Sequence, residues 1–286
     1  MTLPDPPGIH APLAEKVLSA FLFEECNKFG FSRGVLGLSG GVDSAVVLEL
    51  AARGLGAGNV RAFALPYRTS QRESLVLARE AAAHAGVALD EIDITPMADA
   101  HLEAAGLKGD DTRAGRLRRG NILARTRMVV LYDRSAAEKA LVLGTSNKTE
   151  LLLGYGTLFG DLSSAVNPVG DLYKSQIFSL ARHLGVPEAI LARPPSGDLW
   201  EGQTDEDELG FSYAAVDALL NLWIDRRYPR PALEKLGFPG GFLDQVLVRV
   251  HRNQFKRMPP VIAKLANRTI NLDFRYPRDI TAGPGT

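Results

Sequence analysis

In the first half of the chain, short runs of apolar residues alternate with longer segments in which apolar residues recur at helical spacing. Four short apolar runs are predicted strands, at 34–38, 60–65, 89–94 and 140–143. Four longer segments place apolar residues at helical spacing and are predicted helices, at 12–28, 42–55, 73–84 and 121–139. Strands that alternate with helices at this interval indicate a parallel sheet with helices on both faces, so the expected fold class is α/β.

After Pro168 the pattern becomes mostly helical. Further helices are predicted at 173–184, 212–226, 231–236 and 240–253. Two polar segments, 105–120 and 193–210, are predicted loops and candidate lids, because long irregular loops are often functional. We expect one domain over 1–286, made of an arm (1–12), an α/β core (13–170), a helical part (171–266) and an irregular tail (267–286).

The composition narrows the class of partner. The 286 residues carry 33 Lys and Arg against 33 Asp and Glu, a balance that argues against the coating of nucleic acid. Cys26 is the single cysteine, so an internal disulfide and a multi-cysteine zinc site are excluded. No apolar stretch is long enough to span a bilayer, and the first residues lack a signal-peptide pattern. We therefore expect a cytoplasmic protein with neither nucleic-acid nor membrane partners.

The strongest motif is SGGVDS at 39–44, between the first predicted strand and its helix. Its glycines allow a ligand to approach the backbone, and the helix start presents free N–H groups. Together these features predict an anion site suited to phosphate, where Ser39 and Ser44 add donors and Asp43 could hold Mg²⁺. The alternative is a tight turn whose Asp43 complements the helix dipole. The loop has neither the Walker spacing with its lysine nor the GxGxxG spacing.

Three further blocks carry residues with candidate chemistry. Asn121 and Arg125, four apart on a predicted helix, would share a face suited to an anionic ligand, or belong to a solvated basic face. Thr145 follows the fourth predicted strand, at the edge where open α/β sheets bind ligands. Glu150 could be a second metal carboxylate or a surface glutamate. Lys174, at a helix start, could face a phosphate or be an exposed side chain.

The motif at 39–44 resembles SGGxDS, the signature of the ATP-pyrophosphatase superfamily, whose members cleave ATP between its α and β phosphates. Three later blocks narrow the resemblance, namely GNILARTRM at 120–128, GTSNKTE at 144–150 and KRMPP at 256–260. In this order the blocks closely resemble the NAD synthetase family, over residues 13–260. The resemblance implies a five-stranded parallel sheet flanked by helices. It also implies a homodimer with deamido-NAD bound near the subunit interface.

The family's functional positions carry over to this sequence residue by residue. The implied ATP-binding residues are Gly37, Leu38, Ser39, Gly40, Gly41, Val42, Asp43, Ser44, Leu65, Thr145, Lys174 and Ser196. The implied deamido-NAD-binding residues are Asn121, Arg125, Glu150, Tyr155, Gly156, Thr157, Leu158, Phe255 and Lys256. Asp43 and Glu150 would hold Mg²⁺, and the catalytic residues would be Asp43, Ser39 and Lys174. The implied reaction is ATP-dependent amidation of deamido-NAD by ammonia, which gives NAD, AMP and pyrophosphate.

Two positions depart from the pattern of many ammonia-dependent members, which carry Lys in place of Leu158 and Asp in place of Ala165. Around 154–161 the chain instead resembles the synthetase domain of glutamine-dependent members. The chain has no room for the amidase domain of those members, and Cys26 lies in an amphipathic segment next to Glu25, without an electropositive setting. The nitrogen source would therefore be free ammonia or ammonia from a separate glutaminase partner.

Other functions stay open on the residues alone. The nearest rival is another ATP pyrophosphatase, such as a GMP synthetase or a tRNA-modifying enzyme, although the balanced charge disfavours tRNA. A non-catalytic nucleotide-binding module, like a universal stress protein, is disfavoured by the intact motif together with Glu150 and Lys174. A pure interaction protein is disfavoured because the sequence has no repeat. The predicted helix at 12–28 is a candidate for part of the dimer interface.

Overall fold

A parallel sheet lies at the centre of the computed structural model, which describes residues 3–28, 30–196, 204–257, 260, 262–267 and 269. Its four strands are β1 (Gly34–Gly37), β2 (Val60–Ala64), β3 (Ala88–Glu91) and β4 (Leu141–Val142). They lie in the order β3-β2-β1-β4, and each neighbouring pair is parallel. The predicted α/β class and the parallel arrangement are therefore confirmed.

The fifth strand that the family resemblance implied is missing from the described residues. In its place a single parallel bridge joins Leu143 to Val166. Gly144 N donates to Val166 O over 2.7 Å, and Val166 N donates to Val142 O over 3.2 Å. The pairing ends there because Pro168 follows two residues later and has no N–H group to donate. The expectation of five strands is therefore wrong, and the sheet in the described part of the chain has four.

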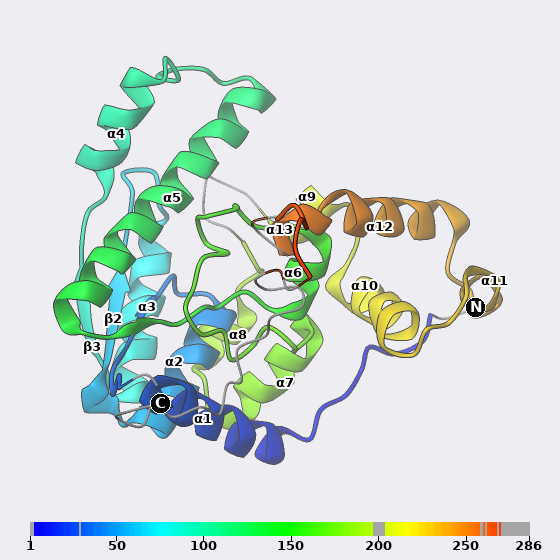
Figure 1. The fold of residues 1–286 in the computed structure, drawn as a ribbon, viewed down its shortest axis with the longest axis horizontal. Helices are drawn as coiled ribbons and strands as arrows, with labels where there is room; N and C mark the ends of the chain where they lie inside the picture. Colours follow the sequence, from blue (N-terminus) through cyan, green and yellow to red (C-terminus); the bar gives the residue numbers. More distant parts are fainter. Residues whose placement is uncertain are drawn as a thin grey trace.

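Helices make up most of the remaining structure (Figure 1). The helices up to residue 153 are α1 (Ala11–Lys28), α2 (Val42–Leu55), α3 (Arg72–Ala85), α4 (Thr95–Ala104), α5 (Arg113–Glu138) and α6 (Lys148–Leu153), with the 3₁₀ turn η1 (Ala57–Asn59). Those that follow are α7 (Lys174–Leu184), α8 (Glu188–Ala192), α9 (Asp205–Leu209), α10 (Tyr213–Leu220), η2 (Asn221–Asp225), α11 (Arg230–Lys235), α12 (Gly240–Arg252) and α13 (Gln254–Arg257). All eight predicted helices are confirmed. None of the helices among the described residues has both the length and the apolar character needed to cross a membrane.

The segment 105–120 is only partly a loop, which corrects the sequence prediction. Helix α5 begins at Arg113, because the Thr112 side chain caps it by accepting a hydrogen bond from Gly115 N over 3.0 Å. The glycines and charges of this segment predicted irregular structure. Gly115 instead allows the Asp110 carboxylate to approach the helix, since a Cβ at this position would lie 2.3 Å from the Asp110 Cγ. Only the part before Thr112 stays a loop.

The segment 193–210 is likewise not a loop throughout. Helix α9 begins at Asp205, and the Thr204 side chain caps it by accepting a hydrogen bond from Asp207 N. Residues 197–203 lie outside the described residues, so the lid prediction is untested there. Most of the predicted irregular tail, 270–286, lies outside them as well.

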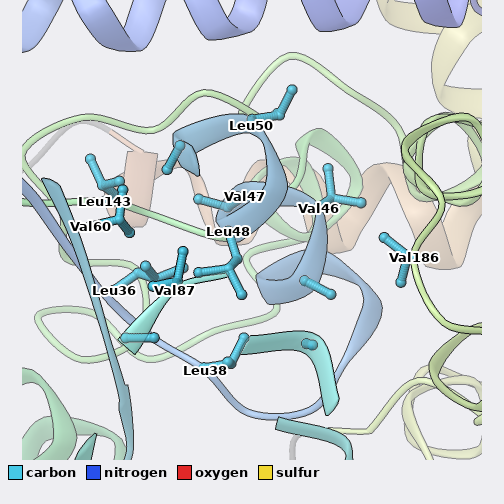
Figure 2. Close-up of a cluster of buried hydrophobic side chains, with 14 of the residues drawn as sticks. Leu36, Leu38, Val46, Val47, Leu48, Leu50, Val60, Val87, Leu143 and Val186 are labelled. Carbon is cyan, nitrogen blue, oxygen red and sulfur yellow. The ribbon is translucent and has the colours of Figure 1, made fainter. Parts of the chain in front are cut away.

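Alternate side chains of the central strands face two different cores. Leu36 is fully buried against α1, α2, α3 and α7, in the cluster drawn in Figure 2. Val35 points to the other face of the sheet and packs with residues of α4 and α5. Cys26 of α1 is fully buried in the first core, and burial raises the pKa of its thiol. Helices therefore cover both faces, as a parallel sheet requires.

The C-terminal helices have a core of their own, beside the sheet (Figure 1). Its fully buried members include Val216, Leu219, Leu233, Leu243 and Val246. Tyr173, directly before α7, packs into this C-terminal core, whereas Ile177 of α7 packs into the core beneath the sheet. Helix α7 thus joins the two cores, and its N-terminus lies between them.

Candidate active site

A pocket of about 650 Å³ opens at the carboxyl ends of β1, β2 and β4. The residues that follow these strands line it, among them Leu38, Leu65 and Thr145. Asn121 of α5 lines another wall, and Lys174 of α7 lines the wall next to the C-terminal helices. The volume lies within the range of small-molecule sites, and open α/β sheets bind ligands at this edge.

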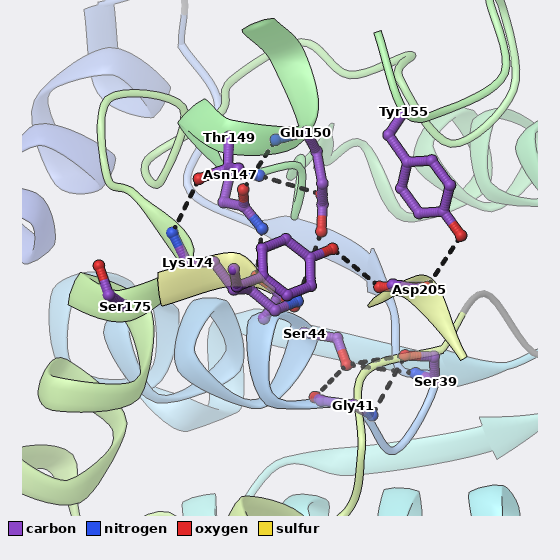
Figure 3. Close-up of polar contacts among 12 residues, drawn as sticks. Ser39, Gly41, Ser44, Asn147, Thr149, Glu150, Tyr155, Lys174, Ser175 and Asp205 are labelled. Carbon is purple, nitrogen blue, oxygen red and sulfur yellow. Dashed lines mark hydrogen bonds and ion pairs between the residues drawn. The ribbon is translucent and has the colours of Figure 1, made fainter. Parts of the chain in front are cut away.

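The SGGVDS loop forms one end of the pocket and is held by its own serines (Figure 3). Ser44 Oγ donates to Gly41 O over 2.9 Å and lies 3.2 Å from Ser39 Oγ. Gly41 N donates to Ser39 Oγ over 3.3 Å. Gly41 directly precedes α2 and has no side chain to cap it, so the first turn keeps its N–H donors for a ligand. A 14-residue helix that begins in this way attracts phosphate through those donors and its dipole.

Replacing Gly40 by Ala is expected to destabilise the protein by about 2–4 kcal/mol. Gly40 has a φ of +76°, and a Cβ there would lie 2.3 Å from Ser74 O of α3. Chemical denaturation measures the change in the free energy of unfolding. Gly58→Ala is the matched control, because a Cβ at Gly58 meets nothing within 4 Å. An unchanged denaturation midpoint in Gly40→Ala would show that α3 can move away from the loop.

A buried lysine and two carboxylates from different elements meet beside this loop (Figure 3). Lys174 Nζ lies 2.5 Å from Asp43 Oδ2 and 3.4 Å from Glu150 Oε1. Asn147 Nδ2 donates to the second carboxylate oxygen of Asp43 over 2.8 Å. Lys174 is the first residue of α7, and only 2% of its surface is exposed. The alternative of an exposed lysine is therefore wrong, and the cation beside the helix N-terminus is explained by its carboxylate partners.

The environment shifts the proton affinities of this cluster in opposite senses. Burial and the charge of Asp43 raise the pKa of the Glu150 carboxyl to about 8, although the charge of Lys174 opposes the shift. Burial acts to lower the pKa of the Lys174 ammonium, but the charges of Asp43 and Glu150 outweigh it and raise that pKa. Glu150 is thus not the surface glutamate of the alternative reading. Lys174 keeps its charge, and Glu150 needs a further cation to be fully ionised at neutral pH.

A third carboxylate, that of Asp217, holds together the two helices that carry Glu150 and Lys174. Asp217 of α10 is fully buried and accepts from Thr149 Oγ1 over 2.5 Å and from Ser175 N over 2.7 Å. Lys174 N in turn donates to Thr149 Oγ1 over 3.1 Å. Burial raises the pKa of Asp217, and its hydrogen bonds oppose the shift. The N-termini of α6 and α7 are therefore fixed side by side by a residue of the C-terminal core.

Asp205 of α9 lines the pocket next to the cluster and joins two tyrosines (Figure 3). Tyr155 OH donates to one carboxylate oxygen of Asp205 over 3.0 Å, and Tyr213 OH donates to the other over 2.9 Å. Lys174 Nζ lies 5.1 Å from the centre of the Tyr213 ring. Burial raises the pKa of Asp205. These contacts close the pocket on the side of the C-terminal helices.

The loop 154–161 lies between Asp205 with its tyrosines and helix α5. Thr157 Oγ1 donates to Asn121 Oδ1 over 2.9 Å, and Thr157 N donates to Asp161 Oδ1 over 2.8 Å. Lys256 Nζ donates to Gly154 O and Gly156 O, each over 2.8 Å. Burial lowers the pKa of the Lys256 ammonium. This wall of the pocket therefore carries amide, hydroxyl and ammonium groups.

Comparison with known protein families gives one match, to NAD synthase over residues 15–260. The chain belongs to the NAD synthase family. Among its relatives, the NH₃-dependent NAD⁺ synthetase of Pelodictyon phaeoclathratiforme is 55% identical over 267 residues, which cover 93% of this chain and 94% of that protein. This high identity over almost the full length places the chain among the C–N ligases of the family.

Solved structures of the NAD synthase family share the fold. The NH₃-dependent NAD synthetase of Campylobacter jejuni, in complex with the nitrate ion, has a TM-score of 0.74 and 33% identity, over 90% of this chain and 100% of that one. The NMN synthetase of Francisella tularensis has a TM-score of 0.77 and 31% identity, over 91% and 100%. The chain therefore shares its fold with one enzyme named for the synthesis of NAD and another named for the synthesis of NMN.

Most residues that the NAD synthetase resemblance singled out line the one pocket. Those predicted for ATP that line it are Gly37, Leu38, Ser39, Gly41, Val42, Asp43, Ser44, Leu65, Thr145, Lys174 and Ser196. Those predicted for deamido-NAD that line it are Asn121, Glu150, Tyr155, Gly156, Thr157 and Lys256. Gly40, Arg125, Leu158 and Phe255 do not line it. Arg125 is exposed and its Nε donates to Leu158 O over 3.3 Å, while Phe255 is 53% exposed.

Several residues of the site were missed at the sequence level: Asp205 and Arg249 line the pocket, and Asn147 and Tyr213 contact residues that line it. Asn147 could have been found, because Asn147 and Glu150 form a capping box at the start of α6, a pattern that is readable in the sequence. Asp205, Tyr213 and Arg249 come from the C-terminal helices. No local pattern distinguishes them from ordinary helix residues, since only the tertiary fold brings them to the sheet.

Proposed function

We propose that the protein is an ammonia-dependent NAD synthetase, which converts deamido-NAD, ammonia and ATP to NAD, AMP and pyrophosphate. The observation that carries the proposal is the Lys174–Asp43–Glu150 cluster beside an uncapped helix N-terminus, in a chain of the NAD synthase family. A cation, two carboxylates and free N–H donors are what a site for polyphosphate cleavage needs. Nucleotide binding without catalysis does not require a buried lysine paired with Asp43 and Glu150.

The reaction proceeds in two displacements. The nicotinate carboxylate attacks the α-phosphorus of ATP, the bond to the bridging oxygen breaks, and pyrophosphate leaves with its electron pair. The N–H groups of the SGGVDS loop and the Lys174 ammonium offset the charge that develops on the leaving group. Ammonia then attacks the carbonyl carbon of the adenylate, loses a proton, and AMP leaves. Water must stay out of the closed site, since it would hydrolyse the adenylate.

The donor set beside the loop fits Mg²⁺. Asp43 and Glu150 offer carboxylate oxygens, the ligands that Mg²⁺ prefers, and it usually binds one or two carboxylates plus phosphate oxygens. Among the described residues no group of three or more His, Cys, Asp or Glu is arranged to hold a metal alone. We therefore infer that Asp43 and Glu150 hold Mg²⁺ together with the phosphates of ATP. When bound, the ion would neutralise the charge on the leaving pyrophosphate.

We further propose a homodimer in which α5 forms the interface. Leu117 and Asn121 line the pocket, and Arg125, Val129 and Tyr132 continue the same face of α5 beyond it. Val129 is 59% exposed and Tyr132 is 38% exposed. An exposed stripe that begins in the pocket favours a second ligand shared with a partner subunit. This surface supports a dimer better than α1, which packs against α2 and α7 and buries Leu22 and Cys26.

We propose that residues 13–266 act as one catalytic unit, because the core and the helical part both contribute pocket walls. The nitrogen source is free ammonia or ammonia from a separate glutaminase. Cys26, the single cysteine, is fully buried away from the pocket, which leaves no thiol in the pocket for glutamine hydrolysis.

The test is NAD formation by the purified protein from ATP, Mg²⁺, deamido-NAD and ammonium, with AMP measured in parallel. We expect NAD and AMP in a ratio of one to one, and no NAD when glutamine replaces ammonium. Nicotinate mononucleotide is assayed as the competing acceptor, because a related structure is named NMN synthetase. A higher kcat/KM for the mononucleotide would change the proposed substrate. No AMP with either acceptor would overturn the proposed reaction.

A further inference from the structure

Arg249 of α12 brings a positive charge to the wall of the pocket. It is not among the residues that the family resemblance singled out. Its side chain lines the pocket, and its Nε is fully buried without a hydrogen-bond acceptor in the described part of the chain. The guanidinium carbon lies 5.8 Å from the centre of the Tyr155 ring, in a cation–π contact. A ring face satisfies part of the charge of a guanidinium and none of its N–H donors.

A buried N–H donor without an acceptor, such as Arg249 Nε, is unfavourable in the ligand-free protein. Burial lowers the pKa of the Arg249 guanidinium, although the negative charge of Glu208 opposes the shift. Buried N–H donors in proteins are nearly always hydrogen-bonded, and an unpaired one costs stability. The guanidinium is also planar and presents its donors as a fork that matches an oxyanion. The unpaired Nε therefore points to a partner that arrives with a ligand.

The position of Arg249 assigns it to the second substrate rather than to ATP. The phosphate end of the pocket already has the SGGVDS loop and the Lys174 ammonium. Arg249 instead contacts Tyr155 at the start of the loop 154–161, and its charge acts on Lys256, which holds that loop through Gly154 O and Gly156 O. Arg249 and Lys256 together form a positive corner of the pocket beside the loop 154–161.

We propose that Arg249 is a substrate-binding residue whose guanidinium reorients to donate N–H groups to an oxyanion of deamido-NAD. This inference rests on the proposed function. Two groups of that dinucleotide have the required chemistry, the nicotinate carboxylate and the pyrophosphate. Both are planar or tetrahedral oxyanions of the kind that a guanidinium fork binds. A carboxylate contact would also explain how the site distinguishes its substrate from the amide product.

The test measures Kd for deamido-NAD and for NAD by calorimetry, with the wild-type protein, Arg249→Gln and Arg249→Lys. We expect deamido-NAD to bind Arg249→Gln about 10- to 100-fold more weakly, the usual effect of losing a charge-assisted hydrogen bond. Arg249→Lys keeps the charge and loses the fork, so it should bind about 3- to 10-fold more weakly. If only deamido-NAD is affected, the contact is to the carboxylate. If NAD is affected equally, the contact is to the pyrophosphate.

Arg252→Gln is the matched control, since Arg252 lies on the same helix, is exposed and is outside the pocket wall. It should keep wild-type affinity for both dinucleotides. The KM for ATP should stay within about twofold in the Arg249 variants. Arg249 Nε has no acceptor to lose in the ligand-free protein, so the thermal midpoint of Arg249→Gln should fall only by the small contribution of the cation–π contact with Tyr155.

Wild-type affinity for deamido-NAD in the folded Arg249 variants would overturn the inference, as would an equal rise in the KM for ATP. If Arg249→Gln does not fold, the affinity of Arg249→Lys decides alone, and an unchanged value there overturns it. Failure of the proposed function is distinguishable, because it would appear as absence of deamido-NAD turnover in the wild-type protein itself.

Discussion

Asp43→Ala is expected to lower kcat for NAD formation about 1,000-fold while the protein stays folded. Asp43 lies in the first turn of α2, where its two carboxylate oxygens contact Lys174 Nζ and Asn147 Nδ2. Without the carboxylate, the site loses an inferred Mg²⁺ ligand, and Lys174 keeps only the longer contact to Glu150. The charge on the departing pyrophosphate is then poorly neutralised. Steady-state assay of AMP release, with Mg²⁺ varied, measures the loss.

Asp244→Ala is the matched control for this substitution. Asp244 also pairs with a basic residue, Arg230, but both side chains are exposed and neither lines the pocket. An exposed ion pair contributes little, so this variant should keep wild-type kcat and stability. Circular dichroism checks that both variants are folded. If Asp43→Ala kept wild-type turnover, Asp43 would serve only to complement the dipole of α2.

Lys174→Met is expected to abolish measurable turnover, with kcat lowered by more than about 1,000-fold, and to destabilise the ligand-free protein by about 3–5 kcal/mol at neutral pH. The substitution leaves Asp43 and Glu150 facing each other without the buried cation that both contact. One buried carboxylate of such a pair must then take a proton to remain inside the protein. Its ability to do so depends on pH.

The sign of that pH dependence follows from Glu150. Its pKa is raised in the folded wild-type protein, to about 8, so the folded form binds a proton more readily than the unfolded chain. Stability from this proton is complete at low pH and is lost as the pH rises toward 8. Removing the lysine raises the same pKa further. The destabilisation of Lys174→Met should therefore be smaller at pH 5 than at pH 8 when unfolding is followed with denaturant.

The matched control for this variant is Lys235→Met, because Lys235 is an exposed residue of α11 outside the pocket. It should change neither kcat nor the dependence of stability on pH. Lys174→Arg keeps the charge and tests whether charge alone is enough. A destabilisation of Lys174→Met that is equal at both pH values would show that Glu150 is not coupled to the lysine in the folded protein.

The sequence predicted the parts of the site that depend on local pattern. The bounds of α2 and the placement of the SGGVDS loop after β1 follow from an apolar run, a glycine turn and a helical period within a short stretch of chain. Such local signals survive folding because neighbouring residues produce them. Lys174 and Glu150 were also candidates from the later sequence blocks, and both line the pocket although each is far from the loop along the chain.

What the sequence could not predict depends on distant contacts. The contact between Leu143 and Val166, which are far apart along the chain, is a single bridge where a fifth strand was expected. The error at 113–120 had a local cause instead, because the glycines of 105–120 outweighed the helix cap that Asp110 and Thr112 form just before α5. Arg249 reaches the pocket only through the packing of α12 against α6 and α10. No spacing along the chain contains that information.

The hydrogen bonds that Asp217 accepts from Thr149 and Ser175 have a consequence for the order in which parts of the site are made during synthesis of the chain. A ribosome-bound chain that ends before α10 already contains the whole sheet, the SGGVDS loop and Lys174. It does not yet contain the carboxylate that holds Thr149 and Ser175 together. The sheet, the SGGVDS loop and Lys174 are therefore synthesised first, and their fixed arrangement waits for Asp217. A chain that stops between α9 and α10 would contain Asp43, Glu150 and Lys174 but would lack the carboxylate that holds the N-termini of α6 and α7 together.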